Sequence, residues 1–259
     1  VCRKQSPYRY NSQADYRSNP VKLIIYSDDE KARKPIAVSA KKYNFDLCVA
    51  TGKYRWYKDL ETRTRKTLEL LENLKPDELV VVTDGHDVFV NDDASEFKRR
   101  YYEHYNEKIV FQSEHQNWPD PRLEKQCLEK HTDPHGYSFL CFGMHAGTAG
   151  QLVELYRKGL WIGEVDDELK QINPHLHWSF DDQLFAVKQY LQRDDIIIDA
   201  DCHLCQSMQA PALQSGDIEL HPDHIINKTK NTRPVFIHGH GNVNIKQIYD
   251  SIVARYGYT

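Results

Sequence analysis

The sequence predicts an α/β fold, in which a doubly wound, Rossmann-like parallel sheet is covered by helices on both faces. The chain opens with an apolar run at 22–26, a helical segment that reaches about residue 40, and a second short apolar run at 46–50. This β-α-β order is typical of parallel sheets. Further apolar runs alternate with segments of helical spacing, and several end in polar residues, as strands do where open α/β sheets bind ligands.

The remaining elements are predicted from the same two signals. Leu68, Leu71 and Leu74, for example, share one face of a helix. A segment at 139–150 begins apolar and then contains small residues, and a long loop is expected from 202 to about 231. The expected strands are 22–26, 46–50, 79–82, 108–111, 196–199 and 233–237. The expected helices after the first are 64–74, 94–105, 151–160, 179–191 and 246–256.

Length and composition indicate a globular protein with one main domain. The 259 residues are expected to form a polar N-terminal arm at 1–20 and a single domain at 21–259. Hydrophobic residues make up 40% of the chain and the formal net charge is -4, so no broad basic surface for nucleic acid is expected. No apolar run approaches the roughly 18 residues that a membrane span requires.

The six cysteines are too sparse for a disulfide scaffold. Cys202 and Cys205 form a single C-x-x-C, and no second ligand pair lies nearby at the spacing of a zinc finger. A disulfide or packed thiols are therefore expected there rather than zinc. Asn227 and Thr229 belong to an N-glycosylation sequon, which fits a protein of the secretory pathway but also occurs often by chance.

A candidate metal site follows the apolar run at 79–82. Asp84 and Asp87 stand three residues apart at the end of this expected strand, and Gly85 lets the chain turn between them. Carboxylate oxygens suit Mg2+ and Mn2+. His238 ends the last expected strand, and strand ends in a doubly wound sheet share one edge, so the three side chains make a plausible metal site. The alternative interpretation of the two aspartates is a polar turn that caps a buried strand.

Four motifs occur in the same order as in a known family. They are VVVTDGHDV at 80–88, FQSEHQNWP at 111–119, FDDQLF at 180–185 and PVFIHGHGN at 234–242. This pattern resembles the glycosyltransferase domain of procollagen lysyl hydroxylases and its stand-alone relatives, over nearly the whole chain. The resemblance implies a GT-A-type fold that uses Mn2+ (or Mg2+) and a UDP-sugar donor.

The resemblance also implies roles for single residues. Asp84, Asp87 and His238 match the family's Mn2+ ligands, and His86 matches an aromatic position that stacks on the base. The residues expected to bind the nucleotide sugar are Tyr26, Ser27, Thr83, His86, Gly239, His240 and Gly241. The residues expected to line the sugar and acceptor pocket and to act in catalysis are Glu114, Trp118, Asp181 and Asp182, with Trp118 as a flat apolar face and either aspartate as a base.

The sequence departs from the family pattern in three places. The family segment Leu-Asn-Ser-Gly-Gly has its nearest counterpart in LCFGM at 140–144, which lacks the Asn-Ser pair. His240 stands where the family has Asn, and Asn244 where it tends to have Lys. The cation that would bind phosphate stays open among three candidates, which are Arg63, Lys66 and Lys246. These departures leave the fold and the metal site as predicted and leave the sugar and acceptor open.

The resemblance thus implies a hexosyltransferase that uses a UDP-sugar, with UDP-glucose and UDP-galactose as the candidate donors, and a hydroxyl acceptor on protein or glycan. Hydroxylysine or galactosyl-hydroxylysine of collagen-like protein is one candidate acceptor. A non-catalytic module that binds nucleotide sugar or glycan on the same fold is the first alternative. A metal-dependent phosphoesterase that uses Asp84, Asp87 and His238 is the second. By the family, the cysteines and the sequon, the expected location is the lumen of the endoplasmic reticulum or Golgi, or outside the cell.

Overall fold

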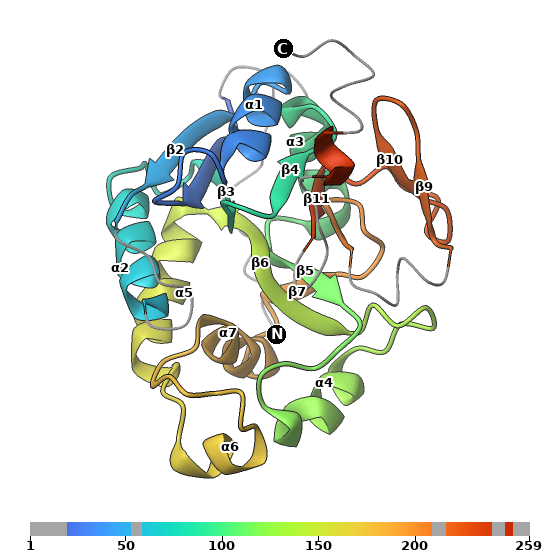
Figure 1. Cartoon of the computed structure of the whole chain (residues 1–259). Helices are drawn as coiled ribbons and strands as arrows, with labels where there is room; N and C mark the ends of the chain where they lie inside the picture. Colours follow the sequence, from blue (N-terminus) through green and yellow to red (C-terminus); the bar gives the residue numbers. More distant parts are fainter. Residues whose placement is uncertain (1–19, 53–58, 209–215, 240–246, 251–259) are drawn as a thin grey trace, which may run out of the picture.

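A central sheet of six strands runs in the order β2-β1-β3-β6-β5-β7 (Figure 1). The computed structural model describes residues 20–52, 59–208, 216–239 and 247–250, and the account that follows concerns those residues. All but two residues of the central strands β3 and β5 are apolar or buried serine, threonine and glutamine, as the continuous apolar runs predict. The strands are β1 (Lys22–Tyr26), β2 (Asp46–Ala50), β3 (Leu79–Asp84), β5 (Ile109–Glu114), β6 (Phe139–Thr148) and β7 (Ile196–Asp199).

The predicted α/β class is confirmed, but the sheet is mixed rather than wholly parallel. β1 pairs in parallel with β2 and β3, and β5 pairs in parallel with β7. Between these two groups lies β6, which is antiparallel to both β3 and β5. The sequence analysis assigned no strand to the segment 139–150, because its glycines and small residues obscure the strand pattern. Because β6 is antiparallel to both of its neighbours, β3 and β5 run in the same direction and end at the same edge of the sheet.

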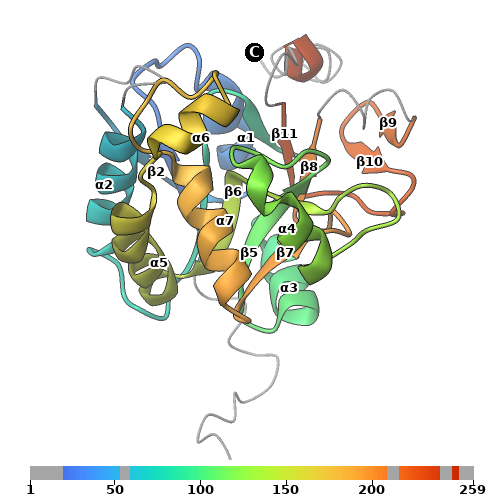
Figure 2. The same ribbon diagram turned by 90° about the horizontal axis from the view of Figure 1, so that it is seen from below.

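Helices cover both faces of the sheet, as predicted (Figure 2). One face packs against α2, α5 and α7 in a core that includes Leu68, Leu152 and Phe185. The other face packs against α1 and α3, whose contributions include Ile36 and Phe97. The helices are α1 (Lys34–Lys42), α2 (Leu60–Leu71), α3 (Ala94–Tyr105), α4 (Glu124–Lys130), α5 (Ala149–Ile162), α6 (Asp167–Ile172) and α7 (Asp182–Gln192), with a 3-10 turn η1 (Pro121–Leu123) before α4.

A second, three-stranded sheet lies beside the first, in the order β4-β11-β8. Its central strand is β11, so the last predicted strand exists but does not join the main sheet. Asn91 holds this region together, because its side-chain amide donates to the carbonyls of Ile225 and Pro234 and accepts from the Ile225 N–H. The expected loop at 202–231 contains three short strands. The strands outside the main sheet are β4 (Val88–Val90), β8 (Cys205–Ser207), β9 (Ile218–Leu220), β10 (Ile225–Asn227) and β11 (Phe236–His238).

The structure also shows the state of the C-x-x-C cysteines and the accessibility of the sequon asparagine. Cys202 and Cys205 are buried free thiols, so packed thiols is the correct one of the two expected alternatives. Asn227 is fully buried and its amide donates to Gln206 and Tyr137, which makes this sequon inaccessible in the folded protein. Among the described residues, no helix is both long and apolar enough to cross a membrane.

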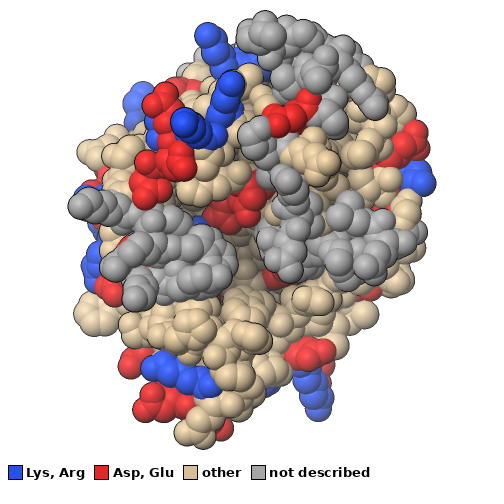
Figure 3. All heavy atoms as spheres, in the orientation of Figure 1, with Lys and Arg blue, Asp and Glu red and all other residues tan. Residues whose placement is uncertain are grey.

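Acidic and basic side chains are interspersed over the described part of the face drawn in Figure 3, in keeping with the small net charge. The expected N-terminal arm lies almost wholly outside the described residues, as does most of the expected C-terminal helix, of which residues 247–250 are helical.

Candidate metal and nucleotide-sugar site

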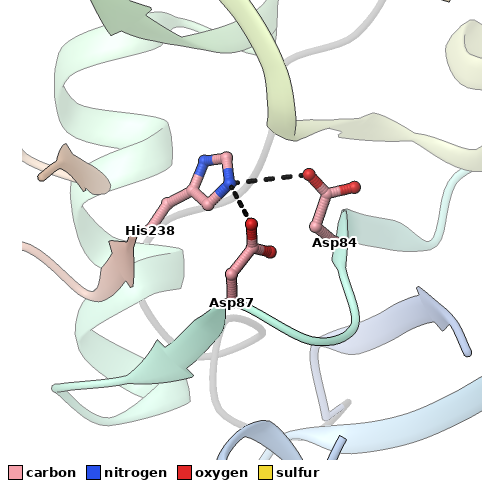
Figure 4. Close-up of side chains that lie close together, drawn as sticks. All are labelled: Asp84, Asp87 and His238. Carbon is pink, nitrogen blue, oxygen red and sulfur yellow. Dashed lines mark ion pairs between the residues drawn. The ribbon is translucent and has the colours of Figure 1, made fainter. Parts of the chain in front are cut away.

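Asp84, Asp87 and His238 come together at one edge of the central sheet (Figure 4). Asp84 is the last residue of β3, and His238 is the last residue of β11. The His238 Nε2 lies 3.5 Å from Oδ2 of Asp84 and 3.5 Å from Oδ2 of Asp87. One ligand atom from each residue lies within 4.8 Å of the other two. The three residues predicted as metal ligands are therefore close enough to share one ion.

His238 reaches the site through a strand pairing that the sequence did not predict. β11 pairs with β4, which follows Asp87 directly, and the Gly239 N–H donates to the Asp87 carbonyl at 2.8 Å. Gly143 on β6 leaves room for the ring, because a Cβ at this position would lie 2.0 Å from Cε1 of His238. The N–H of Gly239, a residue expected to bind the nucleotide sugar, instead ties β11 to the loop that carries Asp87.

Gln112 orients the His238 ring from behind. Its Oε1 accepts a hydrogen bond from Nδ1 of His238 at 2.9 Å, and both side chains are buried. A proton on Nδ1 leaves Nε2 to face the two aspartates, which is the arrangement that a metal-binding histidine needs. Burial lowers the pKa of His238, but the negative charges of Asp87 and Asp84 raise it more, so the pKa stands above its usual value. The same negative charges favour a cation at this point.

The donor set fits a divalent cation. Ligand atoms about 2.1 Å from a small divalent ion lie about 3 Å apart when adjacent and about 4 Å apart when opposite. The distances between the three donors fall near this range and need only small side-chain adjustments. Two carboxylates and one imidazole suit Mn2+ or a similar ion, and Asp84 and Asp87 remain partly exposed on the open side.

Arg63 links one of the candidate metal ligands, Asp84, to the start of α7. Its Nη1 lies 2.5 Å from Oδ1 of Asp84, and its Nη2 lies 2.9 Å from Oδ2 of Asp182. The guanidinium also lies over the ring of Phe142, 5.5 Å from the ring centroid. Of the three candidate phosphate-binding cations, Arg63 lies at the site. Lys66 forms an exposed ion pair with Glu69, and Lys246 lies outside the described residues.

The two aspartates before and at the start of α7 have different tasks. Asp181 is the N-cap, since its side chain accepts from the Leu184 N–H at 2.8 Å, and it also accepts from the Trp178 indole at 3.0 Å. The helix thus begins at Asp182, three residues later than the expected start at 179. Asp182 points to Arg63. Burial raises the pKa of both aspartates, and a carboxyl group with a raised pKa is a candidate general base or acid.

Glu114 and Trp118, the other two predicted pocket residues, are joined by Gln183. The Gln183 Nε2 donates to Oε1 of Glu114 at 2.7 Å and lies 3.2 Å from the carbonyl of Trp118. Glu114 is the last residue of β5 and is buried. The half-buried Trp118 ring packs at the border of a small apolar cluster with Val165, Leu169, Leu176 and Leu184.

The residues predicted to contact the nucleotide lie at the neighbouring strand ends. Tyr26 ends β1 directly beside Asp84 of β3. The Ser27 hydroxyl lies 2.9 Å from Nε2 of His86, which brings these two predicted residues into contact. Thr83 is buried and its hydroxyl donates to the Asp84 carbonyl, so Thr83 stabilises the backbone of the turn that follows β3. Two further residues of this set, His240 and Gly241, lie outside the described residues.

Sequence analysis missed Gln112 as an orienting residue and Gln183 as a link between segments. Both glutamines stand inside the quoted motifs, one residue or two from acidic residues that were singled out. A glutamine that follows a strand or a cap signal looks like an ordinary polar residue. Its meaning depends on which buried groups it meets, and these come from distant parts of the chain.

Comparison with known proteins places the chain in a family. The family model described as the PLOD GT domain matches residues 21–253. An uncharacterized protein, R699, of Acanthamoeba polyphaga mimivirus is 29% identical over 180 residues, which are 69% of this chain and 35% of that protein. A multifunctional procollagen lysine hydroxylase and glycosyltransferase of Caenorhabditis elegans is 27% identical over 176 residues, 64% of this chain and 21% of that protein.

Among solved structures, the bifunctional glycosyltransferase WbbM in its apo form matches with a TM-score of 0.55 at 12% identity, covering 96% of this chain and 51% of that one. Identity this low supports the fold alone. The chain spans about a third or less of the length of the two curated relatives, so their activities as whole proteins do not pass to it directly.

Proposed function

Because the chain belongs to the PLOD glycosyltransferase-domain family, we propose that it is a metal-dependent hexosyltransferase that uses a UDP-sugar donor. The observation that carries this proposal is the convergence of Asp84, Asp87 and His238 at one edge of the central sheet. Ligand sites of open α/β sheets lie at this edge. A bound divalent cation would supply positive charge against the diphosphate as the nucleoside diphosphate departs.

The protein's own residues supply the rest of the site. Arg63 would meet the negative charge of the donor, since its guanidinium lies at the site, between Asp84 and Asp182. Asp182 and Asp181 are buried carboxyl groups with raised pKa, and one of them would accept a proton or bind sugar hydroxyls. Tyr26, Ser27 and His86 would contact the base and ribose in this scheme.

We propose a hydroxyl acceptor, with hydroxylysine or galactosyl-hydroxylysine of collagen-like protein as the first to test. A nematode relative with 27% identity carries both procollagen lysine hydroxylase and glycosyltransferase in its name, which supports this choice. The same relation is the support for a location in the lumen of the secretory pathway. The buried Asn227 gives no support for that location.

The experiment measures UDP release from UDP-glucose and UDP-galactose, with Mn2+ and with EDTA. Water can replace the acceptor, so slow donor hydrolysis is expected before the acceptor is known. Asp87→Asn should reduce Mn2+-dependent release by about 100-fold or more, because it removes a charged ligand. The control is Asp77→Asn, since Asp77 is exposed in the turn before β3, at the opposite edge of the sheet.

Manganese-dependent UDP release that Asp87→Asn abolishes and Asp77→Asn retains would support the proposal and name the preferred sugar. Release of phosphate or nucleoside monophosphate instead of UDP would indicate a phosphoesterase. Binding of UDP with Mn2+, seen as a rise in melting temperature, but no release with any tested acceptor would indicate a binding module. If the protein neither binds UDP with Mn2+ nor releases UDP, the metal assignment is refuted.

A further inference from the structure

Gln183 makes more cross-segment hydrogen bonds than its place in a helix would suggest. Its Oε1 accepts from the Phe142 N–H at 3.2 Å, while its Nε2 lies 2.7 Å from Glu114 Oε1, 3.1 Å from the Leu140 carbonyl and 3.2 Å from the Trp118 carbonyl. The side chain thus joins the first turn of α7 to β6, to the end of β5 and to the segment that carries Trp118.

The orientation of this amide is determined by its neighbours. The group that meets Oε1 is an N–H donor, and the three groups that meet Nε2 are all acceptors. Turning the amide over would place its nitrogen against a donor and its oxygen against three acceptors. At this length a side-chain amide offers its oxygen to the one donor and shares its two N–H groups among the three acceptors.

We propose that Gln183 is a positioning residue that holds the Glu114 carboxylate and the Trp118 segment in the sugar and acceptor pocket. The inference rests on the proposed transferase function. It assigns to Gln183 a role in turnover rather than in nucleotide binding, because its hydrogen bonds reach Glu114 and Trp118 and none of the three metal ligands. Asp182, the preceding residue, faces Arg63, so α7 presents neighbouring side chains to the two ends of the donor.

The test uses Gln183→Glu, which keeps the shape and replaces the donor by a carboxylate. At alkaline pH the new carboxylate would meet Glu114 and two carbonyl oxygens, all acceptors, and would push the Trp118 segment away. When protonated, its carboxyl O–H would again donate to Glu114. Burial beside another carboxylate raises the pKa of such a group. The charged groups that surround the position are Glu114 from β5, Asp181 and Asp182 from α7, Arg63 from α2 and His238 from β11.

The control is Gln189→Glu on the same helix. Gln189 is also buried, and its Nε2 donates to the Leu155 carbonyl at 2.9 Å, on the side of α7 that packs on α5. Its Oε1 lies 3.3 Å from Nη1 of Arg193, so the variant reports the effect of a carboxylate placed in α7 away from the pocket and beside a cation. A second variant, Gln183→Met, keeps the length without any polar atom and has no proton to regain.

Mn2+-dependent hydrolysis of the preferred UDP-sugar is measured between pH 6 and 8, with UDP and Mn2+ binding followed by melting temperature. We expect Gln183→Glu to slow turnover by about 10- to 100-fold at pH 8, the range for losing a hydrogen bond to a charged group. The deficit should shrink to about threefold at pH 6. Gln183→Met should stay slow at both values, Gln189→Glu should match wild type, and all variants should bind UDP with Mn2+ as wild type does.

An active wild type together with a Gln183→Glu variant of equal rate at pH 8 would overturn this inference and leave the proposed function standing. A deficit of the same size at pH 6 and pH 8, or an equal deficit in Gln189→Glu, would also overturn it, since either result indicates general damage to α7. A wild type without any turnover would refute the proposed function first, and the role of Gln183 in turnover with it.

Discussion

Gly143 shows how one missing side chain makes room for the candidate metal site. The residue lies on β6, and the His238 ring occupies the space where a Cβ would stand, with the nearest ring atom at 2.0 Å from that position. Gln112 then holds the ring from the other side through Nδ1. A buried ring confined in this way keeps its Nε2 aimed at Asp84 and Asp87 without a metal to hold it.

Gly143→Ala is therefore expected to displace His238 and to weaken Mn2+ binding by about 10-fold or more, the loss typical when the support of a metal ligand is removed. Overpacking would also lower the free energy of unfolding by about 1–3 kcal/mol. Calorimetric titration of Mn2+ in the presence of UDP measures the affinity. Gly147→Ala on the same strand is the control, since its new Cβ would meet only side-chain atoms at 3.2 Å or more. Equal Mn2+ affinity in both variants would contradict this account of Gly143.

At the scale of elements, the start of α7 combines structural and chemical tasks in consecutive residues. Asp181 caps the helix and holds the Trp178 indole, Asp182 pairs with Arg63, and Gln183 binds Glu114. Cap residues of this type are common in any helix, so Asp181 by itself has an ordinary structural explanation. The question is whether its carboxylate also acts on the donor.

Asp181→Ala tests whether this carboxylate acts in turnover as well as in capping. The control is Asp93→Ala, which removes the N-cap of α3. The Asp93 side chain accepts from the Ser95 N–H at 2.8 Å. Each variant should lose about 1–2 kcal/mol of unfolding free energy through the lost cap. Only Asp181→Ala should also slow UDP-sugar turnover. Urea unfolding and the UDP-release assay measure the two effects. If Asp181→Ala loses stability but keeps its wild-type rate, Asp181 is a helix cap alone.

At the scale of the whole molecule, one buried histidine links stability to pH. His145 lies on β6 between the two helical layers, and Nδ1–H donates to the Phe142 carbonyl while Nε2 accepts from the Tyr156 hydroxyl. Burial lowers the pKa of His145 to about 3. In the unfolded chain its pKa is near 6.5. Between these two values the unfolded state binds a proton that the folded state does not, so stability falls as pH falls through this window.

The free energy of unfolding should therefore drop with acidification below about pH 6.5, with His145 contributing up to about 1.4 kcal/mol per pH unit. His145→Gln carries no proton to gain and should flatten this slope, although it will be less stable at neutral pH. Urea unfolding at pH 7.5, 6.0 and 5.0 measures the slopes. His135→Gln, at an exposed position, should leave the wild-type slope unchanged. An unchanged slope in His145→Gln would show that the acid sensitivity comes from other groups.

Much of the fold follows from patterns that are local in sequence. The strands that begin at Lys22, Leu79 and Ile196 are apolar runs bounded by polar residues, and their positions agree with prediction within two residues. Segments whose apolar signal is diluted were missed, and β6 is the main case. Its glycines and His145 interrupt the pattern, yet all of them are buried, and at Gly143 the His238 ring occupies the space that a side chain would need.

The candidate site divides in the same way. Asp84 and Asp87 are three residues apart, so their proximity could be expected from the chain itself, and order along the chain suggested His238 as the third ligand. The route by which His238 arrives, through β11 and β4 rather than the main sheet, could not be expected, because strand pairing is set by long-range contacts. The same holds for Arg63, which was one of three candidate cations until the structure placed its guanidinium between Asp84 and Asp182.

The sequence by itself determined the α/β class, the four motifs and the types of residue available for metal and sugar chemistry, because apolar periodicity and side-chain chemistry are properties of short segments. Tertiary structure alone decided which buried groups meet: Gly143 against His238, Gln112 behind it, and Gln183 between Glu114 and Trp118. These contacts join residues 65 to 126 positions apart. They exist because buried polar groups must find partners, and the partners become known only when the chain is folded.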